Sequence, residues 1–311
     1  MALSIEIPNA YLEFMSICDE YEIVSLVGKR TSVIISYADD LRMVQRVLDE
    51  HPDENFQCSE FLIRQNDVLL ALGGSLGIIK VLNLSKGTFV GYIQAHGGII
   101  FSIKRYKDEY LLSCSEDTTI KMWDVSELKC VCVFGGYTGH RDHVLSIDVS
   151  DDLRYLASGG TDCSIRVWRI PSSLNKFQCV APIYLSPRIH KFPIQCVRFY
   201  REFLVFYSGE SRIDIISPRY GEVEPTSRTE FVGGVKFEGQ LLRGFEIDDG
   251  MLVAVTESQD IILFKMNDIG FTSQSTILRS TKKGKIRDFR VIRNRMFILF
   301  EDSFFRVLSL A

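Results

Sequence analysis

Residues 134–146, FGGYTGHRDHVLS, begin the part of the sequence whose residue types could do chemistry. His140 is followed by Ser158, by Asp162 and by Trp168 inside the run CSIRVW. A hydroxyl, an imidazole and a carboxylate are the groups of a Ser/His/Asp nucleophilic site. The alternative is scaffolding, because these groups and the indole N–H can satisfy one another when buried, whereas each alone would cost about 1–3 kcal/mol.

A metal site is the third interpretation, since the run HRDH at 140–143 places two histidines and an aspartate together. No G-x-S-x-G, H-E-x-x-H or P-loop motif accompanies the cluster. The other histidines, His51, His96 and His190, are distant in the sequence. The motifs therefore favour scaffolding, and we predict neither an enzyme nor a bound metal or cofactor.

Composition narrows the classes of partner. The formal net charge is −4, so no global positive field attracts nucleic acid. No apolar run approaches the roughly 20 residues of a transmembrane helix, and the N-terminus lacks the pattern of a secretory signal. The eight cysteines include no C-x-x-C pair. We expect an intracellular protein with no membrane contact.

A repeat of about 45 residues organises the elements that must position the cluster. The segments 111–127 (LLSCSEDTTIKMWDVSE) and 155–171 (YLASGGTDCSIRVWRIP) each carry a Ser, an Asp four residues later and a Trp six residues after that. Weaker copies repeat the plan of strand, polar turn and strand. Each unit has one residue at the turn position that Asp162 occupies in the fourth unit. From the first unit to the seventh, these residues are Arg30, Leu76, Asp117, Asp162, Glu210, Ser258 and Asp302.

The pattern predicts four short strands in each of these seven units, and no helical period of apolar residues lies between them. The prediction is an all-β, seven-bladed β-propeller that spans 1–311 as a single domain. The seventh unit ends at LSLA after its third strand, whereas ALSIEIP precedes the first strand of the first unit. We expect this N-terminal strand to close the ring and so to remove an exposed sheet edge.

The Gly-His and Trp signatures resemble those of WD-repeat proteins. That resemblance implies a structural hydrogen-bond network in the fourth blade and a second one in the third. Its expected members are His140, Ser158, Asp162 and Trp168, and His96, Ser113, Asp117 and Trp123.

Longer motifs resemble one WD-repeat family in particular. The run from FGGYTGHRD to CSIRVWRI is similar to the central repeat of the Polycomb family of EED and extra sex combs, where FGG, GHRD, VLS and a terminal LWRI recur. PDENFQC at 52–58, followed by LLALGGSLGIIKVLN, resembles that family's second blade. IHKFPIQCVRFYREFLVFYSGES at 189–211 resembles its fifth. The similarity is strong over 50–215 and faint from 216 onward.

This resemblance implies a nuclear, non-catalytic scaffold of a Polycomb repressive complex 2-like histone H3 lysine methyltransferase that acts in chromatin silencing. The expected partners are a helix of an Enhancer-of-zeste-like SET-domain subunit on one face and a trimethylated histone H3 tail on the other. The alternative is a WD-repeat adaptor of another complex, such as a ubiquitin-ligase substrate receptor, that shares only scaffold residues with the family.

The family's aromatic methyl-lysine cage is degenerate at the matching positions of this chain. One cage aromatic falls at Ala10 or, with a shift of one residue, at Tyr11, and another falls at Gln57 after Phe56. A Trp-Tyr pair of the family matches Leu241 and Leu242. Leucines offer no cation–π attraction, so we expect methyl-lysine reading to be weakened or lost. The acidic loop of Asp49, Glu50, Asp53 and Glu54 could still attract a basic tail.

A basic stretch at 279–295 belongs to this chain rather than to the resemblance. It contains one acidic residue, Asp288, and eight basic ones: Arg279, Lys282, Lys283, Lys285, Arg287, Arg290, Arg293 and Arg295. Such a run is either a solvated edge or a contact for a polyanion, meaning DNA, RNA or an acidic protein surface.

Overall fold

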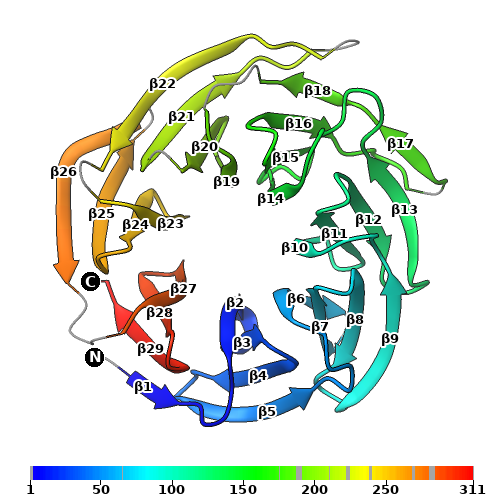
Figure 1. Ribbon diagram of the computed structural model, residues 1–311, viewed down its shortest axis with the longest axis vertical. Helices are drawn as coiled ribbons and strands as arrows, with labels where there is room; N and C mark the ends of the chain where they lie inside the picture. Colours follow the sequence, from blue (N-terminus) through cyan, green and yellow to red (C-terminus); the bar gives the residue numbers. More distant parts are fainter. Residues whose placement is uncertain are drawn as a thin grey trace.

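The computed structural model describes residues 3–310 apart from 65, 175, 187–190, 210, 222–224, 238–239, 268–269 and 280–283. Its strands form seven sheets that are arranged as a ring (Figure 1). The prediction of a seven-bladed all-β propeller is therefore confirmed. In each blade the first strand lies nearest the axis and the fourth lies on the outer rim.

The strands of the first four blades follow in chain order from the inside outward. Blade 1 contains β2 (Leu12–Cys18), β3 (Ile23–Gly28), β4 (Thr31–Ser36) and β5 (Arg42–Leu48), with the short 3-10 helix η1 (Asp19–Tyr21) between β2 and β3. Blade 2 contains β6 (Phe56–Arg64), β7 (Asp67–Gly74), β8 (Ile78–Asn83) and β9 (Thr88–Gln94). Blade 3 contains β10 (Ile100–Tyr106), β11 (Tyr110–Ser115), β12 (Ile120–Asp124) and β13 (Lys129–Phe134). Blade 4 contains β14 (Val144–Val149), β15 (Tyr155–Gly160), β16 (Ile165–Arg169) and β18 (Pro182–Leu185).

The remaining three blades complete the ring. Blade 5 contains β19 (Ile194–Tyr200), β20 (Phe203–Ser208), β21 (Arg212–Pro218) and β22 (Thr229–Lys236). Blade 6 contains β23 (Leu242–Asp248), β24 (Met251–Thr256), β25 (Asp260–Asn267) and β26 (Gly270–Arg279). Blade 7 contains β27 (Ile286–Ile292), β28 (Arg295–Phe300), β29 (Phe304–Ser309) and, as its outermost strand, β1 (Leu3–Glu6).

A left-handed residue marks the turn between the second and third strands of every blade. The seven residues have φ between 54° and 70° and are Arg30, Gly77, Thr118, Cys163, Ser211, Gln259 and Ser303. They fall at, or one residue after, the turn positions predicted from the repeat, among which Glu210 lies outside the described residues. A tight hairpin turn requires positive φ, so the backbone repeats more faithfully than the side chains do.

The N-terminal strand closes the ring as predicted. Residues of β1 pair antiparallel with Phe304–Val307, just before the terminal LSLA. The backbone N–H of Met15 on β2 also donates to the carboxylate of Asp288 on β27, at 2.8 Å. One apolar core cluster joins Ile7 and Leu12 to Phe297 and Phe305 across the same seam. Both hydrogen bonds and apolar packing therefore hold blade 7 against blade 1.

Blade 3 has a fifth strand that the sequence did not predict. The connection from β16 to β18 leaves blade 4, and its short strand β17 (Gln178–Val180) pairs parallel with the outer edge of β13. The N–H of Gly135 donates to the carbonyl of Val180 at 3.2 Å and extends this contact. The chain thus covers one of its own outer edges.

No helix in the part of the chain that the structure describes is long and apolar enough to cross a membrane.

Candidate functional site

The structure brings together the four predicted network residues of blade 4. His140 precedes β14, Ser158 lies on β15, Asp162 lies in the turn before β16, and Trp168 lies on β16. His140 Nε2 is 2.8 Å from Ser158 Oγ, and its Nδ1 is 3.0 Å from Asp162 Oδ2. Trp168 Nε1 donates to the same Ser158 Oγ at 2.9 Å.

These contacts form one directional relay. The indole N–H donates to the serine oxygen, the serine hydroxyl donates to His140 Nε2, and the N–H at Nδ1 donates to Asp162. Only the neutral imidazole protonated at Nδ1 satisfies all three bonds. Burial, which disfavours the charged form, lowers the pKa of His140 and so favours the neutral ring, and the hydrogen bonds place its proton on Nδ1.

Blade 3 contains the same relay. His96 Nε2 is 2.7 Å from Ser113 Oγ, its Nδ1 is 2.8 Å from Asp117 Oδ2, and Trp123 Nε1 donates to Ser113 Oγ at 2.8 Å. Burial again lowers the pKa of the histidine. For Asp117, burial alone would raise the pKa, but the hydrogen bonds from His96 and Thr119 outweigh it and lower the pKa. The two networks are structural equivalents.

A fifth network member was missed by the sequence analysis. Arg166, four residues after Asp162, donates from Nη1 to Asp162 at 2.7 Å and from Nε to the carbonyl of Thr138 at 2.9 Å. Lys121 occupies the equivalent register in blade 3 and donates to the carbonyl of Ala95 at 2.8 Å. The sequence does contain a signal for these two residues, because in both copies a basic residue follows the aspartate by four positions.

Burial argues against the chemical interpretations of this cluster. Ser158 has no exposed surface, and its oxygen already accepts from Trp168 and donates to His140, so no substrate can reach it. In the HRDH run, His143 faces Glu116 and Asp142 at 3.9 and 3.5 Å instead of His140. Among the described residues, no group of three or more His, Cys, Asp or Glu side chains could hold a metal ion.

The degenerate cage positions do not line one common cavity. Tyr11 is half-exposed and Leu241 is exposed, but Phe56 is 1% exposed and packs in the core between blades 1 and 2. Leu242 is buried as well. The Phe56 ring is therefore not free to join a cage, because its first-strand position turns the side chain into the blade interface.

Tyr11 has its ring occupied by the chain's own Arg287. The guanidinium carbon lies 5.4 Å from the ring centroid, and Nη2 donates to the tyrosine hydroxyl at 3.3 Å. Glu301, at 2.8 Å from Nη2, and Glu13, at 3.6 Å from Nη1, hold the arginine in place. An arriving ammonium group would have to compete with this internal cation for the ring.

The acidic loop is also partly used internally. Lys80 Nζ makes a salt bridge to Asp49, lies 3.4 Å from Glu54 Oε2, and sits 5.6 Å from the centroid of the Phe56 ring. Two of the four carboxylates expected to attract a basic tail thus share one internal cation. Glu50 and Asp53 remain exposed at this loop.

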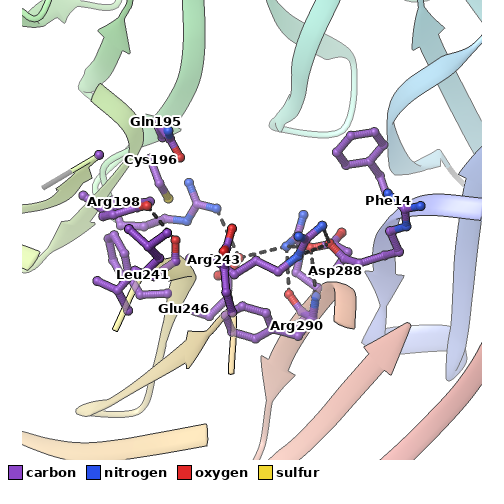
Figure 2. A pocket seen from close by; sticks show the side chains of 17 residues that line it. Phe14, Gln195, Cys196, Arg198, Leu241, Arg243, Glu246, Asp288 and Arg290 are labelled. Carbon is purple, nitrogen blue, oxygen red and sulfur yellow. Dashed lines mark hydrogen bonds and ion pairs between the residues drawn. The ribbon is translucent and has the colours of Figure 1, made fainter. Parts of the chain in front are cut away.

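The cavity beside Leu241 and Leu242 is rich in arginine. It has a volume of about 560 Å³ and opens between the innermost strands of blades 5, 6 and 7. Figure 2 shows Arg198 and Leu241 on one side of it, Phe14 on the other, and Arg243 and Asp288 between them. Phe14 is one of four aromatic residues that line this cavity, with Tyr207, Phe245 and Phe289, and the family motif did not point to it.

Deeper along the axis, the innermost strands carry charges of alternating sign at equivalent register positions. Going around the blades from β2 to β27, these positions are Ser16, Glu60, Lys104, Asp148, Arg198, Glu246 and Arg290. Glu246 accepts from both neighbouring arginines at 3.1 Å. Burial alone would raise the pKa of Glu246, but the two arginine charges lower it. Lys104 lies 3.6 Å from Asp148.

The basic stretch does not form one cationic face among its described side chains. Arg287 is bound to Glu301, Arg290 points into the axial ring of charges, and Arg293 pairs with Asp19 at 2.8 Å. Arg295 lies 3.7 Å from Glu22. Lys282 and Lys283 lie outside the described residues, and the placement of the Arg279 side chain is outside them too.

Comparisons with known proteins agree with this geometry. The family model "WD domain, G-beta repeat" matches residues 87–124 and 128–169, the stretches that contain both relays. Polycomb group protein FIE1 of Oryza sativa subsp. japonica is 26% identical over 66% of this chain and 60% of its own length. Polycomb protein esc of Drosophila melanogaster is 28% identical over 56% of this chain and 46% of its own length.

The chain contains WD repeats and is similar to the EED, esc and FIE proteins of the Polycomb group. Polycomb protein EED of Chaetomium thermophilum is 32% identical over 44% of the chain and 26% of its own length. A solved structure, "Chaetomium thermophilum Polycomb Repressive Complex 2 bound to GSK126", contains a chain that superposes with a TM-score of 0.80 at 15% identity, covering 98% of this chain and 97% of that one. At that identity the superposition shows the fold. The chain spans about half the length of the curated relatives it matches.

Proposed function

We propose that this EED-like propeller is a non-catalytic scaffold subunit of a Polycomb repressive complex 2-like histone H3 lysine methyltransferase, acting in the nucleus in chromatin silencing. We further propose that 1–311 acts as a single propeller domain. The main support is the Polycomb identity of its relatives together with the chain of a Polycomb Repressive Complex 2 structure that it superposes on. The relay residues stabilise the blades, which leaves the surfaces for binding.

The face opposite the relays offers a docking groove for a helix of an Enhancer-of-zeste-like subunit. This face is formed by the turns between first and second strands, and a groove of about 760 Å³ lies there across blades 5 and 6. Apolar side chains of Phe199, Ile247 and Met266 line it, and the charged side chains of Asp249 and Lys265 flank them. An amphipathic helix lays its apolar face into a groove of this kind.

Histone H3 tail binding by this chain does not depend on methylation in our proposal. The Tyr11 ring is covered by Arg287, Phe56 is buried, and leucines stand at two further cage positions. Attraction of a basic tail would rest on Glu50 and Asp53. A polyanion contact at 279–295 has weaker support, because the carboxylates described above already engage four of its arginines.

Affinity purification of the tagged whole chain tests the scaffold role. Recovery of a SET-domain methyltransferase is the expected outcome, and recovery of ubiquitin-ligase subunits in its place would favour the adaptor alternative. Charge reversal at the groove, Asp249→Lys with Lys265→Glu, should reduce that recovery. The matched control is Lys236→Glu, an exposed lysine on the outer strand β22 at the other end of blade 5. Equal loss in groove variant and control would refute this placement of the helix.

A further inference from the structure

The outer strands of blades 1 and 2 concentrate exposed apolar side chains. Among the described residues fourteen large apolar side chains are exposed, and six of them lie on these two strands. They are Met43, Val44 and Leu48 on β5, and Phe89, Val90 and Tyr92 on β9. The two strands follow one another along the rim of the ring (Figure 1). Scattered exposed apolar residues are normal, whereas a cluster beside a groove marks a binding surface.

A groove of about 710 Å³ runs between these two blades and is mainly apolar. Its apolar lining comes from both blades and consists of Val47, Leu48, Pro52, Phe56, Leu72, Leu82 and Phe89. Phe89 is paired with Leu82 across the β8–β9 ladder, and Tyr92 is paired with Lys80. Paired residues share a face of the sheet, so both exposed rings extend the wall of the groove that faces blade 1.

The rim of the groove carries unbalanced negative charge. Asp49, Glu50 and Asp53 lie in this loop with the buried Glu54, against two cations. Lys80 is engaged by Asp49 and Glu54, and the Arg30 guanidinium donates to the backbone carbonyls of Asp49 and Glu50. Glu50 lines the groove, and both Glu50 and Asp53 are exposed with no ion pair to any described residue. A ligand that fills the groove would therefore bring apolar side chains to its floor and a cation to its rim.

We propose that this groove, residues 47–56 with the facing side chains of β8 and β9, binds a segment of a partner protein in which a bulky apolar residue is followed closely by Lys or Arg. The rim charge selects this occupant. A second copy of the chain would bring the same carboxylates against themselves in a two-fold contact, and an anionic lipid surface would be repelled. The groove lies on a different face from the one proposed for the methyltransferase helix, so those two proposals can fail separately. It shares Glu50 and Asp53 with the loop proposed to attract a basic tail, and the apolar floor is what distinguishes the two sites.

Selection of a phage-displayed library of random dodecapeptides on the whole chain tests the proposal. The recovered peptides should share an apolar residue near Lys or Arg, and the synthetic consensus peptide is then titrated by calorimetry. Phe89→Ser with Tyr92→Ser should weaken its binding by about tenfold or more, as loss of two interface aromatics does. The matched control is Phe231→Ser, an equally exposed phenylalanine on the outer strand of blade 5.

The charge of the rim is tested with the same peptide. Glu50→Gln with Asp53→Asn should weaken binding by about three- to tenfold at low salt and much less at high salt, because exposed ion pairs are screened. Asp108→Asn, an exposed aspartate on the opposite face, is the control. Selected peptides without a cation, or binding that survives the Phe89/Tyr92 change, would overturn the proposal. A dimer in sedimentation that this change dissolves would identify a second copy as the occupant instead.

Discussion

Removal of the Asp162 carboxylate should destabilise the protein more than the same change in the equivalent relay. Asp162 accepts from His140, from the N–H of Arg141, from Ser164 and from Arg166. Asp162→Ala leaves the guanidinium of Arg166, whose side chain is 5% exposed, without its carboxylate. Stranding a buried charge costs about 3–5 kcal/mol.

Asp117→Ala is the internal comparison, because its relay has the same geometry but a less buried cation. The side chain of Lys121 is 23% exposed and lies 3.7 Å from Asp117, so water can solvate the ammonium once the carboxylate is gone. We expect a loss of about 1–3 kcal/mol, the cost of unpaired hydrogen-bonding groups. The difference between the two variants isolates the buried charge.

Urea unfolding at neutral pH measures both losses. Trp123 and Trp168 are the two tryptophans of the chain, and both belong to relays, so far-UV circular dichroism must accompany fluorescence. Arg166→Met in the Asp162→Ala background removes the stranded charge and should recover at least about 1 kcal/mol. Equal losses for the two aspartate variants, or no recovery in the double variant, would refute the assignment of Arg166 as the decisive partner.

Three further outcomes are expected. Deletion of residues 1–9 removes β1 and exposes the edge of β29, so the truncated chain should aggregate or unfold at a clearly lower temperature in scanning calorimetry, and a monomer of unchanged stability would contradict closure. His96 and His140 have lowered pKa values in the folded state, so their contribution to stability is complete above the unfolded value of about 6.5 and declines as pH falls below it. Urea unfolding between pH 7.5 and about 5 should show this decline, and a His140→Gln variant should show less of it. Trimethylated and unmethylated histone H3 peptides should bind within about threefold of each other by calorimetry, and a tenfold preference for the methylated peptide would show that other aromatic rings form a cage.

Local sequence determined the fold because a propeller is built from interactions that are short in sequence. Two units share the same Ser-to-Asp and Asp-to-Trp spacings, and turn residues recur with a period of about 45. These signals predict β-hairpins, in which the two paired strands lie only a few residues apart in the sequence. The left-handed residues at all seven turns follow from the same local geometry. Closure of the ring was predictable too. The seventh unit ends with an unpaired third strand, the N-terminus offers an extra strand, and pairing the two removes the exposed sheet edge.

Tertiary structure alone decided what surrounds each candidate binding residue. Arg287 covers the ring of Tyr11 from 276 positions away, and Lys80 takes two carboxylates of the acidic loop. The alternating charges at the axis come from separate blades that only ring closure brings together, and the same closure directs Arg290 inward and away from any polyanion. Cations and aromatic rings recognise one another by distance through space, and the spacing of residues along a chain carries no record of that distance.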